Sequence, residues 1–128
     1  MPRILVVDDD KLHGEYLATL LTRAGEEVEL ATSARQALSR LALGGVDVVI
    51  TDLLMPEVDG IELLREIRHR YPSIRVIGVT GCQPSLRRLA KTLMSHFGLR
   101  TLLPKPIDTN ALHLALKEPA HAGSEGVL

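Results

Sequence analysis

The chain has 128 residues, of which 45% are hydrophobic and only 2% aromatic, and its formal net charge is -1. This length suits one domain with a single aliphatic core, and the balanced charge argues against nucleic-acid binding through bulk positive charge. A single cysteine, Cys82, excludes a disulfide framework within the chain, and no hydrophobic run approaches the length of a membrane span. Because three acidic residues within the first ten positions do not suit a secretory signal, we expect a soluble cytoplasmic domain.

The first part of the chain alternates short hydrophobic runs with helical periodicity. Residues 4–7 are a continuous hydrophobic run, which is typical of a parallel strand covered on both faces. Hydrophobic residues spaced by four then predict an amphipathic helix that ends at Gly25. Its stripe consists of Leu12, Tyr16, Leu20 and Ala24, with Leu17 and Leu21 beside it. Residues 28–31 predict a second strand, and Ser33 with Gln36 predicts a capping box that opens a helix through Leu41.

The same alternation repeats three times over the rest of the chain. Strands are expected at residues 46–50, 74–79 and 101–103. The following helices are marked by three hydrophobic stripes: Ile61, Leu64 and Ile67; Leu86, Leu89, Leu93 and Phe97; and Ala111, Leu112, Ala115 and Leu116. Pro84 suits the first turn of the second of these helices. Five strands alternating with five helices predict an α/β domain with a parallel sheet over residues 1–118, and residues 119–128 are expected to form a flexible tail or linker stub.

Polar residues follow four of the five predicted strands. They are Asp8, Asp9 and Asp10, then Asp52, then Thr80, then Lys105. In an open parallel sheet, ligands bind at the carboxyl ends of the strands, so these side chains are expected to meet there. Gathered carboxylates repel one another and raise their pKa values, and a hard divalent cation such as Mg²⁺ relieves that repulsion. A carboxylate nucleophile, a metal, a lysine and a hydroxyl donor are the parts that phosphoryl transfer needs.

Four motifs in this order closely resemble the receiver domains of two-component response regulators. They are Val-Val-Asp-Asp at residues 6–9, Asp-Leu-Leu-Met-Pro-Glu-Val-Asp-Gly at residues 52–60, Thr80, and Lys105-Pro106. The resemblance extends from Arg3 to about Lys117. It implies a flavodoxin-like (βα)₅ fold with a doubly wound parallel sheet in the strand order 2-1-3-4-5.

The resemblance also implies roles for the acidic residues. Asp52 would accept a phosphoryl group from the phosphohistidine of a sensor histidine kinase or a phosphotransfer protein. Asp9 would bind Mg²⁺ directly, Asp8 would act largely through water, and the backbone carbonyl of Leu54 would supply another metal ligand. Asp52 itself would complete the metal site.

The remaining implications concern signalling. Thr80 and Lys105 would bind the phosphoryl group, and the Lys105–Pro106 peptide bond would be cis. The domain would catalyse only its own phosphorylation and dephosphorylation, and would signal through the face formed by its fourth helix, fifth strand and fifth helix. The expected partners are the kinase or phosphotransfer protein and a downstream protein or output domain, with a homodimer as a further possibility and without direct contact to nucleic acid or membrane.

Two alternatives stay open. Leu102 lies three residues before Lys105, where most receivers carry an aromatic residue, so a degenerate receiver that acts as a constitutive docking module is one alternative. The other is a small aspartyl-phosphate phosphatase, which the spacing of Asp8 and Asp10 superficially fits. Leu12 and the lack of a late acidic pair argue against the phosphatase.

Other residues receive structural interpretations. Asp10 is expected to cap a helix, and the pair Asp59-Gly60 to form a turn only. The histidines at positions 13, 69, 96, 113 and 121 lack zinc-binding spacing and are expected to be surface or packing residues. Cys82 is expected to fill space. The basic residues near the fourth predicted helix, which are Arg87, Arg88, Lys91 and Arg100, are expected to form a solvated face.

Overall fold

The computed structural model describes residues 2–53, 59–81, 84–99 and 101–117. Within these residues five strands and five helices alternate, as predicted. They are β1 (Arg3–Val7), α1 (Lys11–Arg23), β2 (Glu27–Ala31), α2 (Ala34–Leu41), β3 (Val48–Asp52), α3 (Asp59–Arg70), β4 (Arg75–Thr80), α4 (Pro84–Phe97), β5 (Thr101–Pro104) and α5 (Thr109–Lys117). No helix in the described part of the chain is long and apolar enough to cross a membrane.

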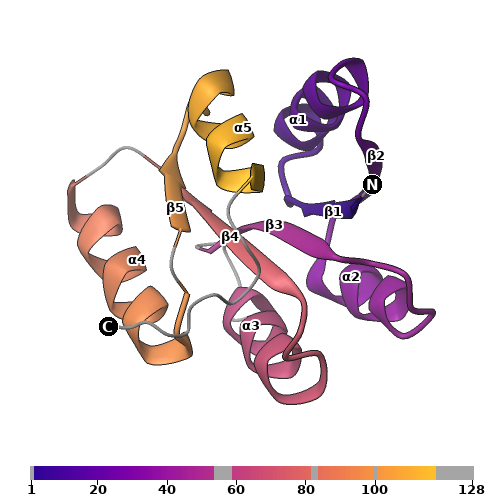
Figure 1. Ribbon diagram of the computed structural model, residues 1–128. Coiled ribbons are helices and arrows are strands. Elements are labelled where there is room, and N and C mark those ends of the chain that lie inside the picture. Colours follow the sequence, from indigo (N-terminus) through magenta and orange to yellow (C-terminus); the bar gives the residue numbers. More distant parts are fainter. Residues whose placement is uncertain (1, 54–58, 82–83, 100, 118–128) are drawn as a thin grey trace.

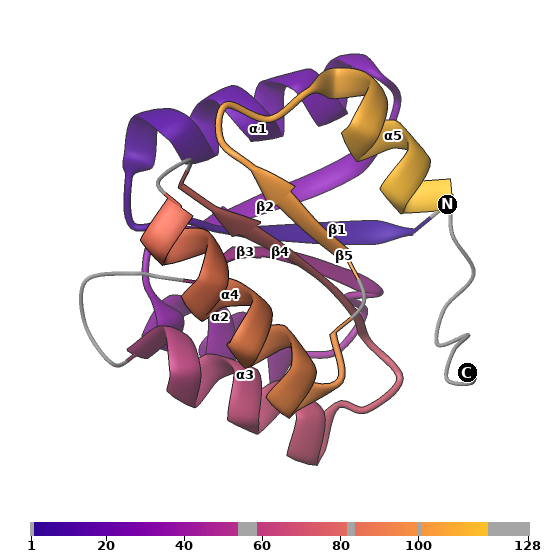
Figure 2. The same ribbon diagram turned by 90° about the vertical axis from the view of Figure 1, so that its left-hand side faces the viewer.

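The strands form one parallel sheet in the order β2-β1-β3-β4-β5 (Figure 1). Helices α1 and α5 lie on one face of the sheet, and α2, α3 and α4 lie on the other (Figure 2). The predicted doubly wound, flavodoxin-like fold with strand order 2-1-3-4-5 is therefore confirmed.

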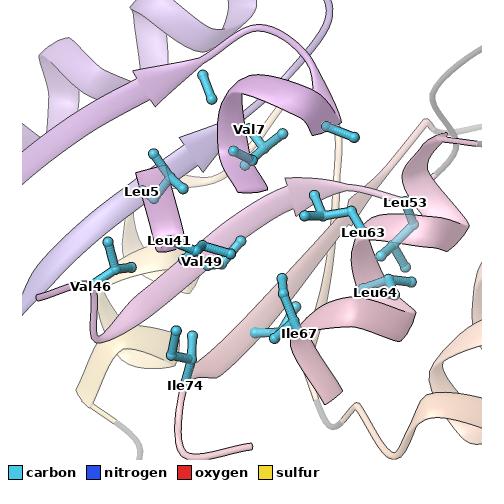
Figure 3. Close-up of a cluster of buried hydrophobic side chains, with 14 of the residues drawn as sticks. Leu5, Val7, Leu41, Val46, Val49, Leu53, Leu63, Leu64, Ile67 and Ile74 are labelled. Atoms are coloured by element: carbon cyan, nitrogen blue, oxygen red, sulfur yellow. The ribbon is translucent and has the colours of Figure 1, made fainter. Parts of the chain in front are cut away.

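Alternate residues of the central strands supply two hydrophobic clusters, one on each face of the sheet. In β1, Ile4 and Val6 belong to the cluster that also contains residues of α1 and α5, whereas Leu5 and Val7 belong to the cluster beneath α2 and α3. Figure 3 shows the second cluster, in which side chains of α3 pack against the sheet. The continuous hydrophobic run at residues 4–7 is thus explained by burial on both sides.

The predicted hydrophobic stripe of α1 is right at Leu17 and Leu21 but wrong at its first two positions. Leu12 and Tyr16 are 78% and 50% exposed, and the buried residues of the helix are Gly14, Leu17 and Leu21. A Cβ atom at Gly14 would come within 2.7 Å of a side chain of β2, so the helix approaches the sheet at its glycine. A glycine carries no hydrophobic signal, and the periodicity therefore indicated a neighbouring face of the helix.

The stripes of α3 and α4 were predicted in part. Leu64 and Ile67 of α3 are buried together with Leu63, but Ile61 is exposed. In α4, Leu89 is also exposed, contrary to the prediction, whereas Phe97 is half-buried against the core. The side chains of Leu86 and Leu93 lie outside the described residues.

Local signals fixed several helix ends. The side chain of Ser33 accepts a hydrogen bond from the Gln36 backbone amide at 3.1 Å. The Gln36 carboxamide oxygen, however, accepts from Thr32 N–H and not from Ser33.

Helix α3 begins at Asp59, so the Asp59-Gly60 pair opens a helix and is not a turn alone. Strand β3 begins two residues later than predicted and extends to Asp52, because its polar end still pairs with β1 and β4.

Candidate functional site

The predicted site residues meet at one edge of the sheet. Asp8 follows β1 directly, Asp52 and Thr80 are the last residues of β3 and β4, and Lys105 follows β5. Since the strands are parallel, their carboxyl ends lie together. One carboxylate oxygen from each of Asp8, Asp9 and Asp52 lies within 4.8 Å of the other two.

Lys105 contacts the acidic cluster directly. Its Nζ lies 2.9 Å from Asp52 Oδ2 and 3.6 Å from Asp8 Oδ2. Burial of the ammonium group lowers the Lys105 pKa, but the hydrogen bond to Asp52 and the charges of Asp52 and Asp8 outweigh burial, so the net shift of the pKa is upward. The lysine therefore stays charged beside the carboxylates.

Asp9 is the exposed member of the cluster, whereas Asp8 and Asp52 are buried. Partial burial raises the pKa of Asp9, and the negative charges of Asp52 and Asp8 raise it further. The three carboxylates therefore destabilise one another, and Lys105 compensates for only part of this repulsion.

Asp8 has a hydrogen-bond partner on each carboxylate oxygen. Its Oδ1 accepts from the backbone N–H of Asp10 at 2.9 Å, and its Oδ2 lies 2.5 Å from His13 Nδ1. The sequence predicts a surface or packing role for His13, and this prediction misses its contact with Asp8. The available signal was its position in the first turn of the helix that follows the acidic residues.

Asp10 caps α1, as predicted. Its side chain accepts a hydrogen bond from the His13 backbone amide at 3.2 Å. Asp10 therefore serves the helix and is separate from the group formed by Asp8, Asp9 and Asp52.

Thr80 completes the edge of the site next to Lys105. Its hydroxyl is buried and has no hydrogen-bond partner within the described part of the chain. Its carbonyl accepts from the Lys105 backbone N–H at 2.7 Å, and the Lys105–Pro106 bond is cis, as the resemblance implied. Leu54, Cys82 and Arg100 lie outside the described residues.

The donor set fits a hard divalent cation. Carboxylate oxygens are the ligands that Mg²⁺ prefers in proteins, and a cation would relieve the repulsion that raises the Asp9 pKa. A buried hydroxyl without a partner and a charged lysine beside it are suited to the oxygens of a phosphoryl group.

Comparison with known families agrees with this arrangement. Residues 4–117 match the model of the response regulator receiver domain. The chain belongs to this family. A receiver domain is the regulatory phosphoacceptor module of two-component signalling, and receivers interact with sensor kinases and output domains.

Individual relatives show the same relationship. The receiver is 41% identical over 115 residues to the transcriptional regulatory protein ZraR of Klebsiella oxytoca, covering 90% of this chain and 25% of ZraR. It is 37% identical over 113 residues to the autoinducer sensor kinase/phosphatase CqsS of Vibrio cholerae, covering 86% of this chain and 16% of CqsS. This receiver therefore spans a quarter or less of the length of these two relatives.

Solved receiver structures have the same fold. A response regulator receiver domain protein of Clostridium thermocellum superposes with a TM-score of 0.80 at 33% identity, with 91% of each chain covered. The sequence-based assignment to the receiver family is thus confirmed.

Proposed function

We propose that this receiver accepts a phosphoryl group on Asp52 from the phosphohistidine of a sensor kinase or a phosphotransfer protein, in a reaction that requires Mg²⁺. The observation that carries the proposal is the environment of Asp52. Its carboxylate is nearly buried at the edge of the sheet, pairs with Lys105 at 2.9 Å and lies beside two further carboxylates.

Charge accounting supports the metal requirement. Three carboxylates and one ammonium group give the cluster a formal charge of -2, because three negative charges are offset by one positive charge. Asp8, Asp9 and Asp52 would hold the ion, with Asp8 acting largely through water, and the family pattern adds the Leu54 carbonyl. Phosphorylation would add further negative charge at Asp52, and a bound divalent cation would offset part of that charge.

The chemistry is a transfer between two nucleophiles. A carboxylate oxygen of Asp52 forms a bond to phosphorus while the bond from phosphorus to the histidine nitrogen breaks, and the imidazole leaves. Lys105 and the Thr80 hydroxyl would donate to the phosphoryl oxygens. In doing so Lys105 exchanges its present partner, Asp52 Oδ2, for the new group.

The same exchange suggests how the signal leaves the site. Lys105 and Thr80 flank the end of β5, which lies between α4 and α5 (Figure 1). We assign partner binding to the face formed by α4, β5 and α5, since movement of these two residues would reach that face first. The phosphatase alternative loses support, because the Asp10 carboxylate that it needs as a second acid is engaged as the cap of α1.

The test is phosphorylation by a small donor. The protein is incubated with acetyl phosphate and Mg²⁺ and its intact mass is measured beside those of Asp52→Asn and Asp47→Asn. Asp47 accepts a hydrogen bond from the Arg3 amide at the opposite end of the sheet, so its variant is the matched control. We expect one added phosphoryl group in the wild type and in Asp47→Asn, and none in Asp52→Asn or in excess EDTA. Equal labelling of Asp52→Asn would refute the assignment, and no labelling of the wild type would favour a constitutive docking module.

A further inference from the structure

We propose that His13 is a positioning residue of the metal site, which acts by fixing the orientation of the Asp8 carboxylate. The inference rests on the proposed function, because it concerns the same acidic cluster. Lone histidines on helices are usually packing or surface residues, and sequence alone gives His13 no other role. The contact with Asp8 separates it from the histidines of the other helices.

The contact is short and largely removed from water. His13 Nδ1 lies 2.5 Å from Asp8 Oδ2, and the two side chains are 16% and 2% exposed. An ionised carboxylate can only accept hydrogen bonds, so the proton lies on Nδ1 and His13 donates. Hydrogen bonds to a charged acceptor are shorter and stronger than neutral ones.

The second oxygen of Asp8 is held as well. Its Oδ1 accepts from the backbone N–H of Asp10 at 2.9 Å, while Asp10 caps α1 by accepting from the His13 amide. The carboxylate group therefore cannot rotate without losing one bond to the backbone and one to the imidazole. The cap fixes the first turn of α1, and this turn brings the imidazole over Asp8.

The other ring nitrogen argues against a packing role. His13 Nε2 is buried and has no hydrogen-bond partner within the described residues. Burial of an unsatisfied polar atom is unfavourable, and a leucine would fill the same space without that cost. The bond from Nδ1 to Asp8 offsets the cost and explains why an imidazole suits the position.

The fixed orientation of Asp8 gives the three acidic residues different roles toward the metal ion. Asp8 Oδ2 already has His13 as a donor and lies 3.6 Å from Lys105, so direct ligation falls to Asp9 and Asp52. Without His13 the carboxylate can turn toward Lys105 or away from the ion. Loss of a partner that orients a metal-binding side chain typically lowers affinity by about 10- to 100-fold.

The experiment measures Mg²⁺ affinity by calorimetric titration for the wild type and three variants. His13→Leu keeps the volume and removes the donor, whereas His13→Asn keeps a donor at a similar position. His69→Leu, on the exposed side of α3, is the matched control. We expect about tenfold weaker Mg²⁺ binding in His13→Leu, retention of most of the affinity in His13→Asn, and no change in His69→Leu. With acetyl phosphate, the labelling rate of His13→Leu should recover at saturating Mg²⁺.

Two controls keep the result interpretable. Far-UV circular dichroism in EDTA shows whether each variant is folded, and His13→Ala repeats the test if His13→Leu does not fold. Affinity in the folded Leu or Ala variant equal to or tighter than that of the wild type would overturn the inference. If the wild type neither binds Mg²⁺ nor is labelled, the proposed function itself fails, which is a different outcome.

Discussion

Removal of the Asp9 charge should stabilise the metal-free protein and destabilise the metal-bound protein relative to the wild type. The reason is the repulsion among the three carboxylates. Partial burial raises the Asp9 pKa, and this repulsion raises it further. Asp9→Asn keeps the shape of the side chain and removes one charge. Asp9 is also the exposed acid of the cluster, so the substitution leaves the core unchanged.

The expected magnitude follows from the spacing of the oxygens. Two unit charges 4.8 Å apart repel by about 0.9 kcal/mol at the dielectric constant of water and by about 3.5 kcal/mol at an effective value of 20. The exposure of Asp9 favours the lower figure, and attraction to Lys105 cancels part of the repulsion from its two neighbours. We therefore expect Asp9→Asn to gain about 1 kcal/mol in EDTA. Mg²⁺ at 100 times its dissociation constant adds about 2.7 kcal/mol to the wild type and less to the variant, so the order of stabilities reverses.

Urea unfolding followed by far-UV circular dichroism, with EDTA or with Mg²⁺, measures both quantities. A gain of 1 kcal/mol raises the midpoint by about 0.3–1 M urea for a protein of this size. Asp10→Asn is the control, because it removes a neighbouring charge but keeps the helix cap. An Asp9→Asn variant that is less stable than the wild type in EDTA would refute the repulsion argument.

The pH dependence of the same difference has a definite sign. The folded-state pKa of Asp9 is raised, so the folded protein binds this proton more tightly than the unfolded chain does. The penalty of the charged Asp9 is therefore fully present above the folded-state pKa and disappears as the pH falls through it. In EDTA, the stability advantage of Asp9→Asn should shrink as the pH falls through the folded-state pKa of Asp9. An advantage that grows on acidification would contradict this expectation.

Four further substitutions, one of them a control, test the packing by urea unfolding. Ile67→Ala should cost about 2–5 kcal/mol because Ile67 is fully buried on the side of α3 that faces the core, whereas Ile61→Ala on the exposed side of the helix should cost much less. Equal losses would contradict the corrected stripe. Gly78→Ala should cost about 1–3 kcal/mol because a Cβ there would lie 2.8 Å from Leu53 Cδ1, and an unchanged midpoint would mean that the leucine can move away. Arg75→Gln should cost about 1–2 kcal/mol, with α5 losing hydrogen-exchange protection first, because the guanidinium donates to carbonyls of its last turn; uniform loss of protection would argue against this tether.

The sequence was sufficient for the fold because its hydrophobic runs and helical stripes alternate regularly. The run at residues 4–7 predicted a strand buried on both faces, and the structure confirms it. The stripes failed where the contact with the sheet depends on a residue without hydrophobic character, as at Gly14, or where a hydrophobic side chain is left exposed, as at Leu12. Periodicity reports which residues are apolar, and packing depends in addition on how closely the backbones approach.

The site was predictable to the extent that parallel strands bring their carboxyl ends together. Asp8, Asp52, Thr80 and Lys105 each lie at such an end, and their side chains or backbones meet as expected. His13 could not be identified in this way, because it belongs to a helix. Its contact with Asp8 depends on the direction in which the first turn of α1 leaves the sheet, and no spacing rule gives that direction.

Leu102 stands in β5 where most receivers carry an aromatic residue, and the end of this strand is joined to β4 through the backbone. The Lys105 N–H donates to the Thr80 carbonyl at 2.7 Å, so the two residues proposed to hold the phosphoryl group are joined through their backbones. A shift of the backbone at either residue would lengthen or break this hydrogen bond. Leu102 lies three residues earlier in β5 and, like Met94 and Phe97 of α4, is half-buried against the same core cluster. The proposed signalling face therefore holds Leu102 of β5 and two residues of α4 in one hydrophobic cluster, without an aromatic residue at position 102.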